Sequence, residues 1–304
     1  MIKKLAAVSL MALMFQGCAT KPLSEPVATW QPATMLNSQE TIMHPSYADK
    51  EYLIQVATIG DRPASGYPVI YVLDGNAFFA VALSIAQMMH GKPSEKNPKS
   101  FMVVGIGYTS GKQFDIPKRT HDYTPPAEYY PEPKGEQVAF GGADYFHAFM
   151  VDELAPMLDK KFGINPNHRT LMGHSYGGLF GLYVLFSRSE SFDHYVIASP
   201  SIWWNDKSIL AHRSGLIDTP NIKNILITLG EQELTARHRN PNAPIMDLPN
   251  SDAYLMYEFL QQQLPNAKVN FEFNSGYSHG ENAYPSMIQG VTMAYQACKA
   301  DQDC

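Results

Sequence analysis

The sequence has few cysteines, no excess of positive charge and no apolar run long enough to span a membrane. Three cysteines among 304 residues are too few for a disulfide framework, and they lie too far from any Cys/His cluster to suggest a zinc site. The 29 acidic and 23 basic side chains leave a net charge of −6, which argues against nucleic-acid binding because that function needs a basic excess. A hydrophobic share of 45% is instead typical of a globular protein that buries a sizeable core.

The first twenty residues have the composition of an export signal. Two lysines precede an apolar run over residues 5–15, which is too short to cross a bilayer as a helix. The pair Gly17-Cys18 resembles the end of a bacterial lipoprotein signal, in which the cysteine is lipidated; simple cleavage after Ala19 is the alternative. We expect a signal peptide over residues 1–17, export to the periplasm, and anchoring to the outer membrane through lipidated Cys18. Loss of the two lysines would change the net charge from −6 to −8.

The remainder divides into a tether and one domain. Residues 18–45 are polar and proline-rich, which predicts a tether, and residues 46–304 have the length of a single domain. Cys298 and Cys304 lie close together near the C-terminus. In an oxidising compartment they could pair, and two free thiols are the alternative.

Strand and helix patterns alternate along the domain. Runs of β-branched and aromatic residues predict strands at residues 51–58, 67–73, 101–108, 169–173, 195–198, 222–229 and 269–273. Apolar positions at helical spacing predict helices at residues 78–89, 143–162, 177–187, 253–264 and 285–295. This alternation predicts an α/β fold with a mostly parallel central sheet and helices on both faces. Residues 109–142 and 235–250 have no clear period, and we expect them to form long loops over the active site.

A short motif indicates nucleophilic catalysis. Residues 173–177 read GHSYG and match G-x-S-x-G, between a predicted strand and a predicted helix. A strand–turn–helix with this motif is the nucleophile elbow, which holds a serine in a strained turn above the sheet. We therefore expect Ser175 to be the nucleophile.

A serine hydroxyl needs a base and an orienting acid. In this fold the order along the chain is serine, acid, histidine. His279 follows the last predicted strand, which makes it the expected base. Glu233 follows the preceding strand and is the expected acid, with Glu231 as its competitor. We expect no metal or other cofactor.

Two backbone N–H groups should form the oxyanion hole. One is expected from Tyr176, the residue after the nucleophile. We expect the other from Asn76, with Gly75 allowing the backbone to approach the substrate; a simple turn before the next helix is the alternative interpretation of Asp74-Gly75-Asn76.

These motifs, together with others along the chain, resemble a known family. The segments LDGNA, R-x-x-D-Y-T-P, SPSIWW, LGEQE and GYSHG, together with the elbow, are similar to the esterase D-like branch of the α/β-hydrolases. More narrowly, residues 50–296 resemble the exported enterobactin and salmochelin trilactone esterases of bacterial iron uptake. The resemblance implies an α/β-hydrolase fold and a serine esterase that cuts the lactone bonds of a catecholate siderophore such as ferric enterobactin, promoting iron release in the periplasm. It carries the nucleophile to Ser175 and the base to His279.

The ferric substrate implied by this resemblance is a bulky trianion, which would favour cations and aromatic faces around the site. Arg119 in the first long loop, Arg237 in the second, and Trp204 after a strand end are the expected substrate-binding residues. Solvated loop cations and a packing tryptophan are the alternative interpretation.

Two other function classes compete. One is an exported carboxylesterase that acts on aryl or acylated-sugar esters, which the long aromatic loops would also suit. The other is a non-enzymatic lipoprotein that binds a ferric siderophore, although the order of serine, acid and histidine argues against it.

Overall fold

An eight-stranded sheet forms the centre of the protein in a computed structural model that describes residue 35 and residues 37–92, 94, 96–128, 138–235, 247–301 and 304. The strands are β1 (Ser38–Met43), β2 (Tyr52–Ile59), β3 (Tyr67–Leu73), β4 (Phe101–Tyr108), β5 (Ile164–His174), β6 (His194–Ala198), β7 (Asn224–Gly230) and β8 (Lys268–Asn274). Their spatial order is β1-β2-β4-β3-β5-β6-β7-β8. The β1–β2 and β2–β4 pairs are antiparallel, and all pairs from β4 to β8 are parallel.

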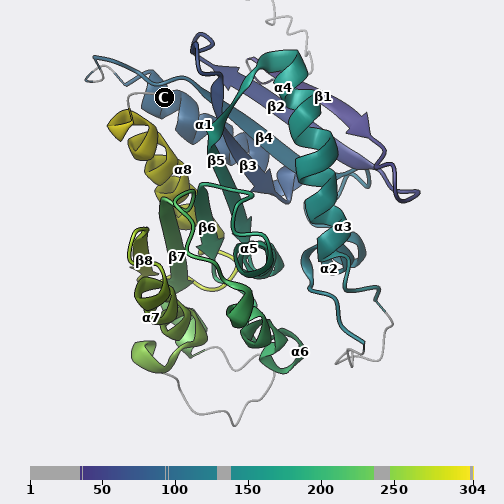
Figure 1. Ribbon diagram of the computed structural model, residues 1–304, viewed down its shortest axis with the longest axis vertical. Coiled ribbons are helices and arrows are strands. Elements are labelled where there is room, and N and C mark those ends of the chain that lie inside the picture. Colours follow the sequence, from purple (N-terminus) through teal and green to yellow (C-terminus); the bar gives the residue numbers. More distant parts are fainter. Residues whose placement is uncertain are drawn as a thin grey trace, which may run out of the picture. The chain divides into compact units, whose positions relative to one another are not determined.

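Helices cover both faces of this sheet (Figure 1). The helices are α1 (Gly75–His90), α2 (Ile116–Tyr123), α3 (Ala143–Ala148), α4 (Ala155–Phe162), α5 (Tyr176–Ser187), α6 (Trp204–Lys207), α7 (Asp252–Gln263) and α8 (Ala283–Ala300). A π-helical segment, η1 (Phe149–Leu154), and three 3₁₀ segments, η2 (Ser208–Gly215), η3 (Glu231–Leu234) and η4 (Leu248–Asn250), complete the described elements.

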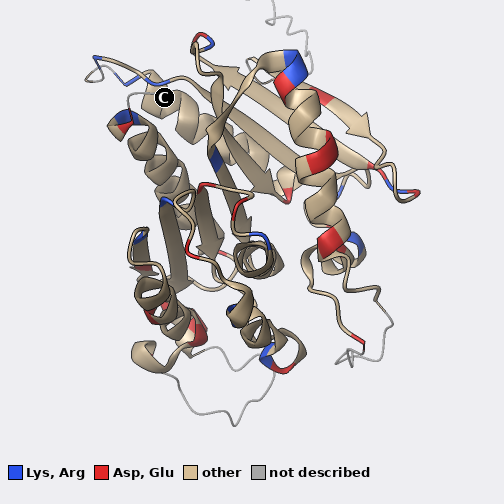
Figure 2. Cartoon of the chain, viewed as in Figure 1, with Lys and Arg blue, Asp and Glu red and all other residues tan. Residues whose placement is uncertain are grey.

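Two apolar cores lie on opposite faces of the sheet. Side chains from α1 and α8 pack on one face, and side chains from α3, α5 and α7 pack on the other. Strand β3 shows the reason, because every residue in it is buried and successive residues enter different cores, with Tyr71 on one side and Val72 on the other. Strands buried on both faces read as continuous apolar runs, which is why this strand was predicted with the observed bounds. Figure 2 shows that charged residues lie mostly on helices and loops, with few on the central strands.

The predicted tether over residues 18–45 extends too far, because Ser38–Met43 forms strand β1. Most of its side chains are exposed, and the strand is held by backbone pairing with β2. A polar edge strand of this kind has no hydrophobic alternation, so its side chains carry little signal. The predicted signal peptide and Cys18 lie outside the described residues, which all belong to the unit Met35–Cys304.

The first long loop was predicted without structure, yet it contains helix α2. The Asp115 side chain caps this helix by accepting a hydrogen bond from the Lys118 N–H, and Pro117 lies in its first turn. Its buried positions include the polar residues Arg119 and Asp122, so the helix has no apolar stripe for a periodicity argument to detect.

The helix predicted over residues 143–162 is present as three consecutive segments, α3, η1 and α4. Pro156 follows the π-helical segment and lacks the N–H that would bond to the Asp152 carbonyl in a regular α-helix. At the C-terminus Cys298 and Cys304 form a disulfide, which decides between the two alternatives for these residues. Among the described residues no helix is both long and apolar enough to pass through a membrane.

Close approach of α1 to the sheet depends on Gly75. A Cβ there would lie 2.8 Å from the Gly105 carbonyl carbon and 2.8 Å from the Ile106 nitrogen of β4. The structure requires glycine at this position for packing against β4, and the role of Gly75 in approach to a substrate stays a prediction. Gly181 in α5 differs, because an added Cβ would meet Ile197 at an ordinary 3.4 Å.

Gly75→Ala should therefore lower the free energy of unfolding by about 1–3 kcal/mol, since rigid backbone of β4 must move. Gly181→Ala is the matched control and should leave stability unchanged or raise it by up to about 1 kcal/mol, because alanine favours helix. Urea denaturation followed by circular dichroism measures both. Equal losses in the two variants would contradict the packing argument.

Candidate active site

Ser175 occupies a tight turn between β5 and α5. Its backbone has φ 61° and ψ −115°, a conformation that costs energy for a residue with a side chain. The backbones of Gly173 and Gly177 approach closely in this turn, since a Cβ on Gly173 would lie 2.4 Å from the Gly177 carbonyl group. The Ser175 N–H donates to the Ala198 carbonyl at 2.9 Å, and its own carbonyl accepts from the Ser201 N–H at 3.1 Å. The serine is thus fixed to the end of the neighbouring strand β6.

Three side chains predicted from the sequence lie in one hydrogen-bonded chain. The Ser175 Oγ is 2.9 Å from His279 Nε2, and His279 Nδ1 is 2.6 Å from Glu233 Oε2. A carboxylate can only accept, so Nδ1–H donates to Glu233 and Nε2 is left to accept the serine proton. The same geometry supports proton removal from serine and stabilisation of the imidazolium that follows.

Glu233 is held as a carboxylate by three donors. Besides His279, the Ser199 hydroxyl donates to Oε1 at 2.6 Å and the Gly230 N–H donates to it at 2.7 Å. Burial by itself raises the pKa of Glu233, but the hydrogen bonds from His279, Ser199 and Gly230 outweigh it, so the pKa lies below the ordinary value of 4.5. Gly230 is required at this turn because a Cβ there would lie 2.5 Å from the Tyr277 carbonyl oxygen.

Glu231, the competing acid, has a different place. Its Oε2 accepts from the Ser275 hydroxyl at 2.6 Å and from the Gly276 N–H at 2.7 Å. These contacts tie η3 to the loop at 275–282 that carries His279. The exposed Glu231 carboxylate therefore anchors the loop that carries His279, whereas the half-buried Glu233 carboxylate contacts His279 itself.

Sequence reasoning missed several polar residues that support this chain. Asn282 donates to the Ser199 hydroxyl oxygen at 2.8 Å and accepts from Asn274 at 2.6 Å, which connects the end of the base loop to β6 and β8. The Ser201 hydroxyl lies 3.2 Å from the Ser175 Oγ. Ser199 and Ser201 belong to the SPSIWW segment, and their position after a strand end is the signal that could have identified them.

The two residues expected to form an oxyanion hole begin two helices. Tyr176 is the first residue of α5, and Asn76 is the second residue of α1. These helix starts lie side by side, since a Cβ on Gly177 would be 4.0 Å from the Asp74 carboxylate and 3.5 Å from Leu73. The Asn76 side chain accepts from the Tyr108 N–H at 2.7 Å and donates to the Tyr108 carbonyl at 2.9 Å, which fixes the start of α1 to the end of β4.

Arg119 differs from the expected exposed cation. Only 6% of it is exposed, and its guanidinium makes two 2.9 Å hydrogen bonds to the Asp74 carboxylate. Burial by itself lowers the pKa of Arg119, but Asp74 raises it above the ordinary value, so the group stays charged. It also donates to the His174 carbonyl at 3.4 Å and stacks near the ring of Tyr176. Arg119 therefore ties α2 to the elbow and to the start of α1, with its charge already compensated.

Trp204 is also placed differently from the prediction. It is 0% exposed and belongs to the apolar core, so it offers no surface to a substrate. Its neighbour Trp203 packs near Tyr176, with ring centroids 5.8 Å apart, and lines a small cavity of about 140 Å³ beside His279 and Glu233. Trp203, rather than Trp204, is therefore the tryptophan that lines a cavity beside His279 and Glu233. The third predicted contact, Arg237, lies outside the described residues.

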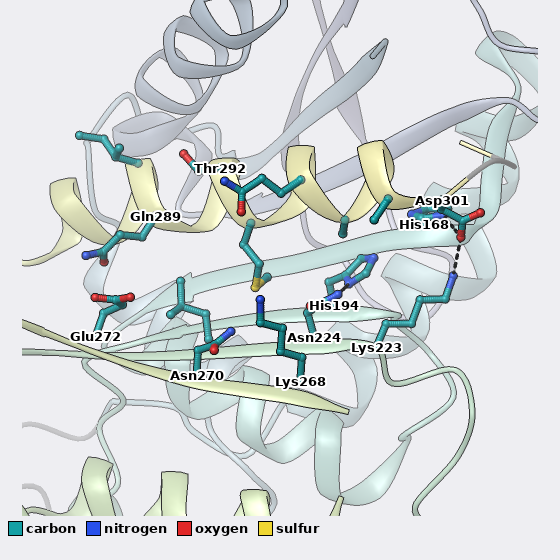
Figure 3. A pocket seen from close by; sticks show the side chains of 16 residues that line it. His168, His194, Lys223, Asn224, Lys268, Asn270, Glu272, Gln289, Thr292 and Asp301 are labelled. Atoms are coloured by element: carbon teal, nitrogen blue, oxygen red, sulfur yellow. Dashed lines mark hydrogen bonds and ion pairs between the residues drawn. The ribbon is translucent and has the colours of Figure 1, made fainter. Parts of the chain in front are cut away.

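A larger cavity of about 550 Å³ lies away from Ser175, His279 and Glu233, between β7, β8 and α8 (Figure 3). Its lining includes His194, Lys223 and Lys268, and none of the three residues of the hydrogen-bonded chain. Within the described ranges no group of three or more His, Cys, Asp or Glu side chains could hold a metal ion.

Breaking the buried ion pair should be costly. Arg119→Met leaves the Asp74 carboxylate buried without its partner, and we expect the free energy of unfolding to fall by about 3–5 kcal/mol. The double variant Asp74→Asn/Arg119→Met removes both charges and should lose less than the single variant. Urea denaturation of the three proteins tests this, and a larger loss in the double variant would refute the unpaired charge as the cause.

The lowered pKa of Glu233 predicts a pH-dependent stability. Since the folded state favours the ionised form, this contribution is present above about pH 4.5 and is lost as the pH falls through the folded pKa. The Glu233→Gln variant has no carboxyl group that can titrate at this position. The difference in unfolding free energy between wild type and Glu233→Gln should therefore shrink as denaturation is measured at progressively lower pH. A difference that stays constant down to about pH 3 would contradict this prediction.

Comparisons with known proteins place this chain in a family. The family model described as "Putative esterase" matches residues 50–283. The siderophore enterobactin esterase of Emericella nidulans is 36% identical over 174 residues, 55% of this chain and 56% of that protein. The ferri-bacillibactin esterase BesA of Bacillus subtilis is 35% identical over 190 residues, 60% of this chain and 65% of that protein. The chain thus spans less than two thirds of the length of these curated relatives.

A solved structure extends the likeness to nearly the whole chain. The BES protein from Bacillus cereus is 30% identical with a TM-score of 0.76, covering 88% of this chain and 99% of that one. The comparisons confirm the resemblance drawn from the sequence motifs. The chain belongs to the Esterase family and has the predicted α/β-hydrolase fold.

Proposed function

We propose that the protein is a serine esterase that hydrolyses the ester bonds of a catecholate siderophore. The observation that carries the proposal is the hydrogen-bonded chain from Ser175 through His279 to Glu233, set at a strained turn between β5 and α5. A nucleophile, a base and an orienting acid in this order are the parts that acyl transfer needs. The relatives named enterobactin and ferri-bacillibactin esterases supply the substrate class.

In the proposed first step, Ser175 attacks an ester carbonyl while His279 Nε2 takes its proton. Glu233 accepts the Nδ1 hydrogen bond throughout and stabilises the imidazolium. The backbone N–H groups of Tyr176 and Asn76 would donate to the developing oxyanion, with the positive ends of α5 and α1 favouring that charge. His279 then returns the proton to the leaving alcohol, and the acyl group stays on Ser175.

The second step removes the acyl group by the same route. His279 takes a proton from water, the hydroxide attacks the acyl carbonyl, and the proton returns to the Ser175 Oγ as the acid leaves. In a trilactone each such cycle opens one ester bond. A siderophore with opened esters holds Fe(III) less tightly, so we propose that the reaction promotes iron release.

We further propose that this reaction occurs in the periplasm. The apolar run over residues 5–15, with lysines before it, supports export, and the Gly17-Cys18 pair supports a lipid anchor. The Cys298–Cys304 disulfide fits the same compartment, because disulfides persist where the environment is oxidising.

The test is mass-resolved hydrolysis of ferric and iron-free enterobactin by the purified protein, with Ser175→Ala beside it. We expect linear products from the wild type and a rate at least about 10⁴-fold lower from the variant, because the nucleophile is lost. The ratio of the two wild-type rates gives the preferred form.

Turnover of p-nitrophenyl butyrate is the control for general esterase activity. Normal turnover of this ester without products from enterobactin would reject the siderophore and favour a carboxylesterase for aryl or acylated-sugar esters. Binding of ferric enterobactin with no ester turnover at all would reject the enzyme and favour a binding protein.

A further inference from the structure

His174 directly precedes Ser175 and contacts His279, the base that would activate Ser175. Its Nε2 lies 2.7 Å from the carbonyl oxygen of His279, and the two imidazole rings are 4.8 Å apart between centroids. It is 6% exposed, and Phe78 packs edge-on against its ring. The last residue of β5 therefore contacts the base loop directly.

We propose that His174 is a positioning residue, whose Nε2–H holds the main chain of His279 so that its ring lies between Ser175 and Glu233. The inference rests on the proposed function, since it assigns a role in the same reaction. A carbonyl oxygen can only accept a hydrogen bond, so the proton of His174 must be on Nε2. The contact therefore fixes one tautomer of His174 as well as the backbone of His279.

The charge state of His174 suits this role. Burial and the neighbouring His279 lower the pKa of His174 to about 3, with Glu233 and Arg119 as the other charged groups that act on it. Arg119 is itself neutralised by Asp74. A neutral His174 keeps its single N–H for the carbonyl and adds no positive charge beside His279 when that ring takes the serine proton.

His174 contacts the base loop at its middle. Glu231 and Gln232 hold its first residues, through Gly276 and the carbonyl of Tyr277, and Asn282 holds its end. Ser278 is bonded within the loop, because its N–H donates to the Glu281 carboxylate at 3.1 Å and its carbonyl accepts from the Asn282 N–H at 2.9 Å. The side chain of His279 is nevertheless 37% exposed, and a Cβ on Gly280 would meet nothing within 4 Å. Within the described part of the chain, it is His174 that provides a hydrogen bond to the backbone of His279 itself.

Two substitutions separate this role from simple packing. His174→Leu fills similar space without a donor, and His174→Gln keeps an N–H near the position of Nε2. For p-nitrophenyl butyrate we expect His174→Leu to lower kcat by about 10- to 100-fold with little change in KM, because a displaced base loses its alignment with Ser175. His174→Gln should recover most of this loss.

Thermal unfolding and active-site titration with a fluorophosphonate confirm that both variants are folded and count their competent sites. A folded His174→Leu protein with kcat within about twofold of wild type would overturn the inference. So would a His174→Gln protein that is folded and as slow as His174→Leu. Ser175→Ala is measured in parallel: if it retained wild-type turnover, the proposed function itself would fail, whatever the His174 variants do.

Discussion

The turn at Ser175 is the constraint on which the other parts of the site depend. A left-handed backbone at a residue with a side chain is costly, and it persists here because its surroundings leave it no alternative. Gly173 and Gly177 approach too closely for any Cβ on Gly173, and the backbone of Ser175 bonds to residues at and beyond the end of β6. The strain thus places the Ser175 Oγ where side chains from the ends of β7 and β8 can reach it.

Two glutamates two residues apart illustrate how local environment divides similar groups. Glu233 is mostly buried and accepts hydrogen bonds from His279, Ser199 and the Gly230 N–H, so it serves as an ionised partner for an imidazole. Glu231 is exposed and bonds to Ser275 and Gly276 instead. One carboxylate faces the base and the other holds the loop that carries the base, so both contribute to the position of His279.

Buried charge around the elbow acts mainly through alignment. The Asp74–Arg119 pair connects the start of α1, helix α2 and the end of β5, which are three elements that border Ser175. An ion pair removed from water contributes little net stability when intact, but losing either partner is expensive. Such a pair tolerates few arrangements, and this restricts how the three elements can shift relative to one another.

Much of the protein could be predicted from residue pattern alone. The strand at residues 67–73 and the motif at residues 173–177 are local signals, because a doubly buried strand must be apolar throughout and an elbow must have glycine where backbones meet. Ser175 and His279 could be named, and the acid restricted to Glu233 or Glu231, because chain order and strand ends restrict where such side chains can lie. These features depend on short segments, and the sequence by itself determined them.

Tertiary structure decided the features that depend on partners distant in sequence. The amino acid types of Arg119 and Trp204 suited a charged, aromatic pocket, yet Asp74 neutralises one and the core encloses the other. Helix α2 and strand β1 lacked apolar periodicity, and they form because a buried ion pair and a neighbouring strand stabilise them. The choice between Glu231 and Glu233, and the contact of His174 with His279, followed from distances of a few ångströms that residue spacing does not encode.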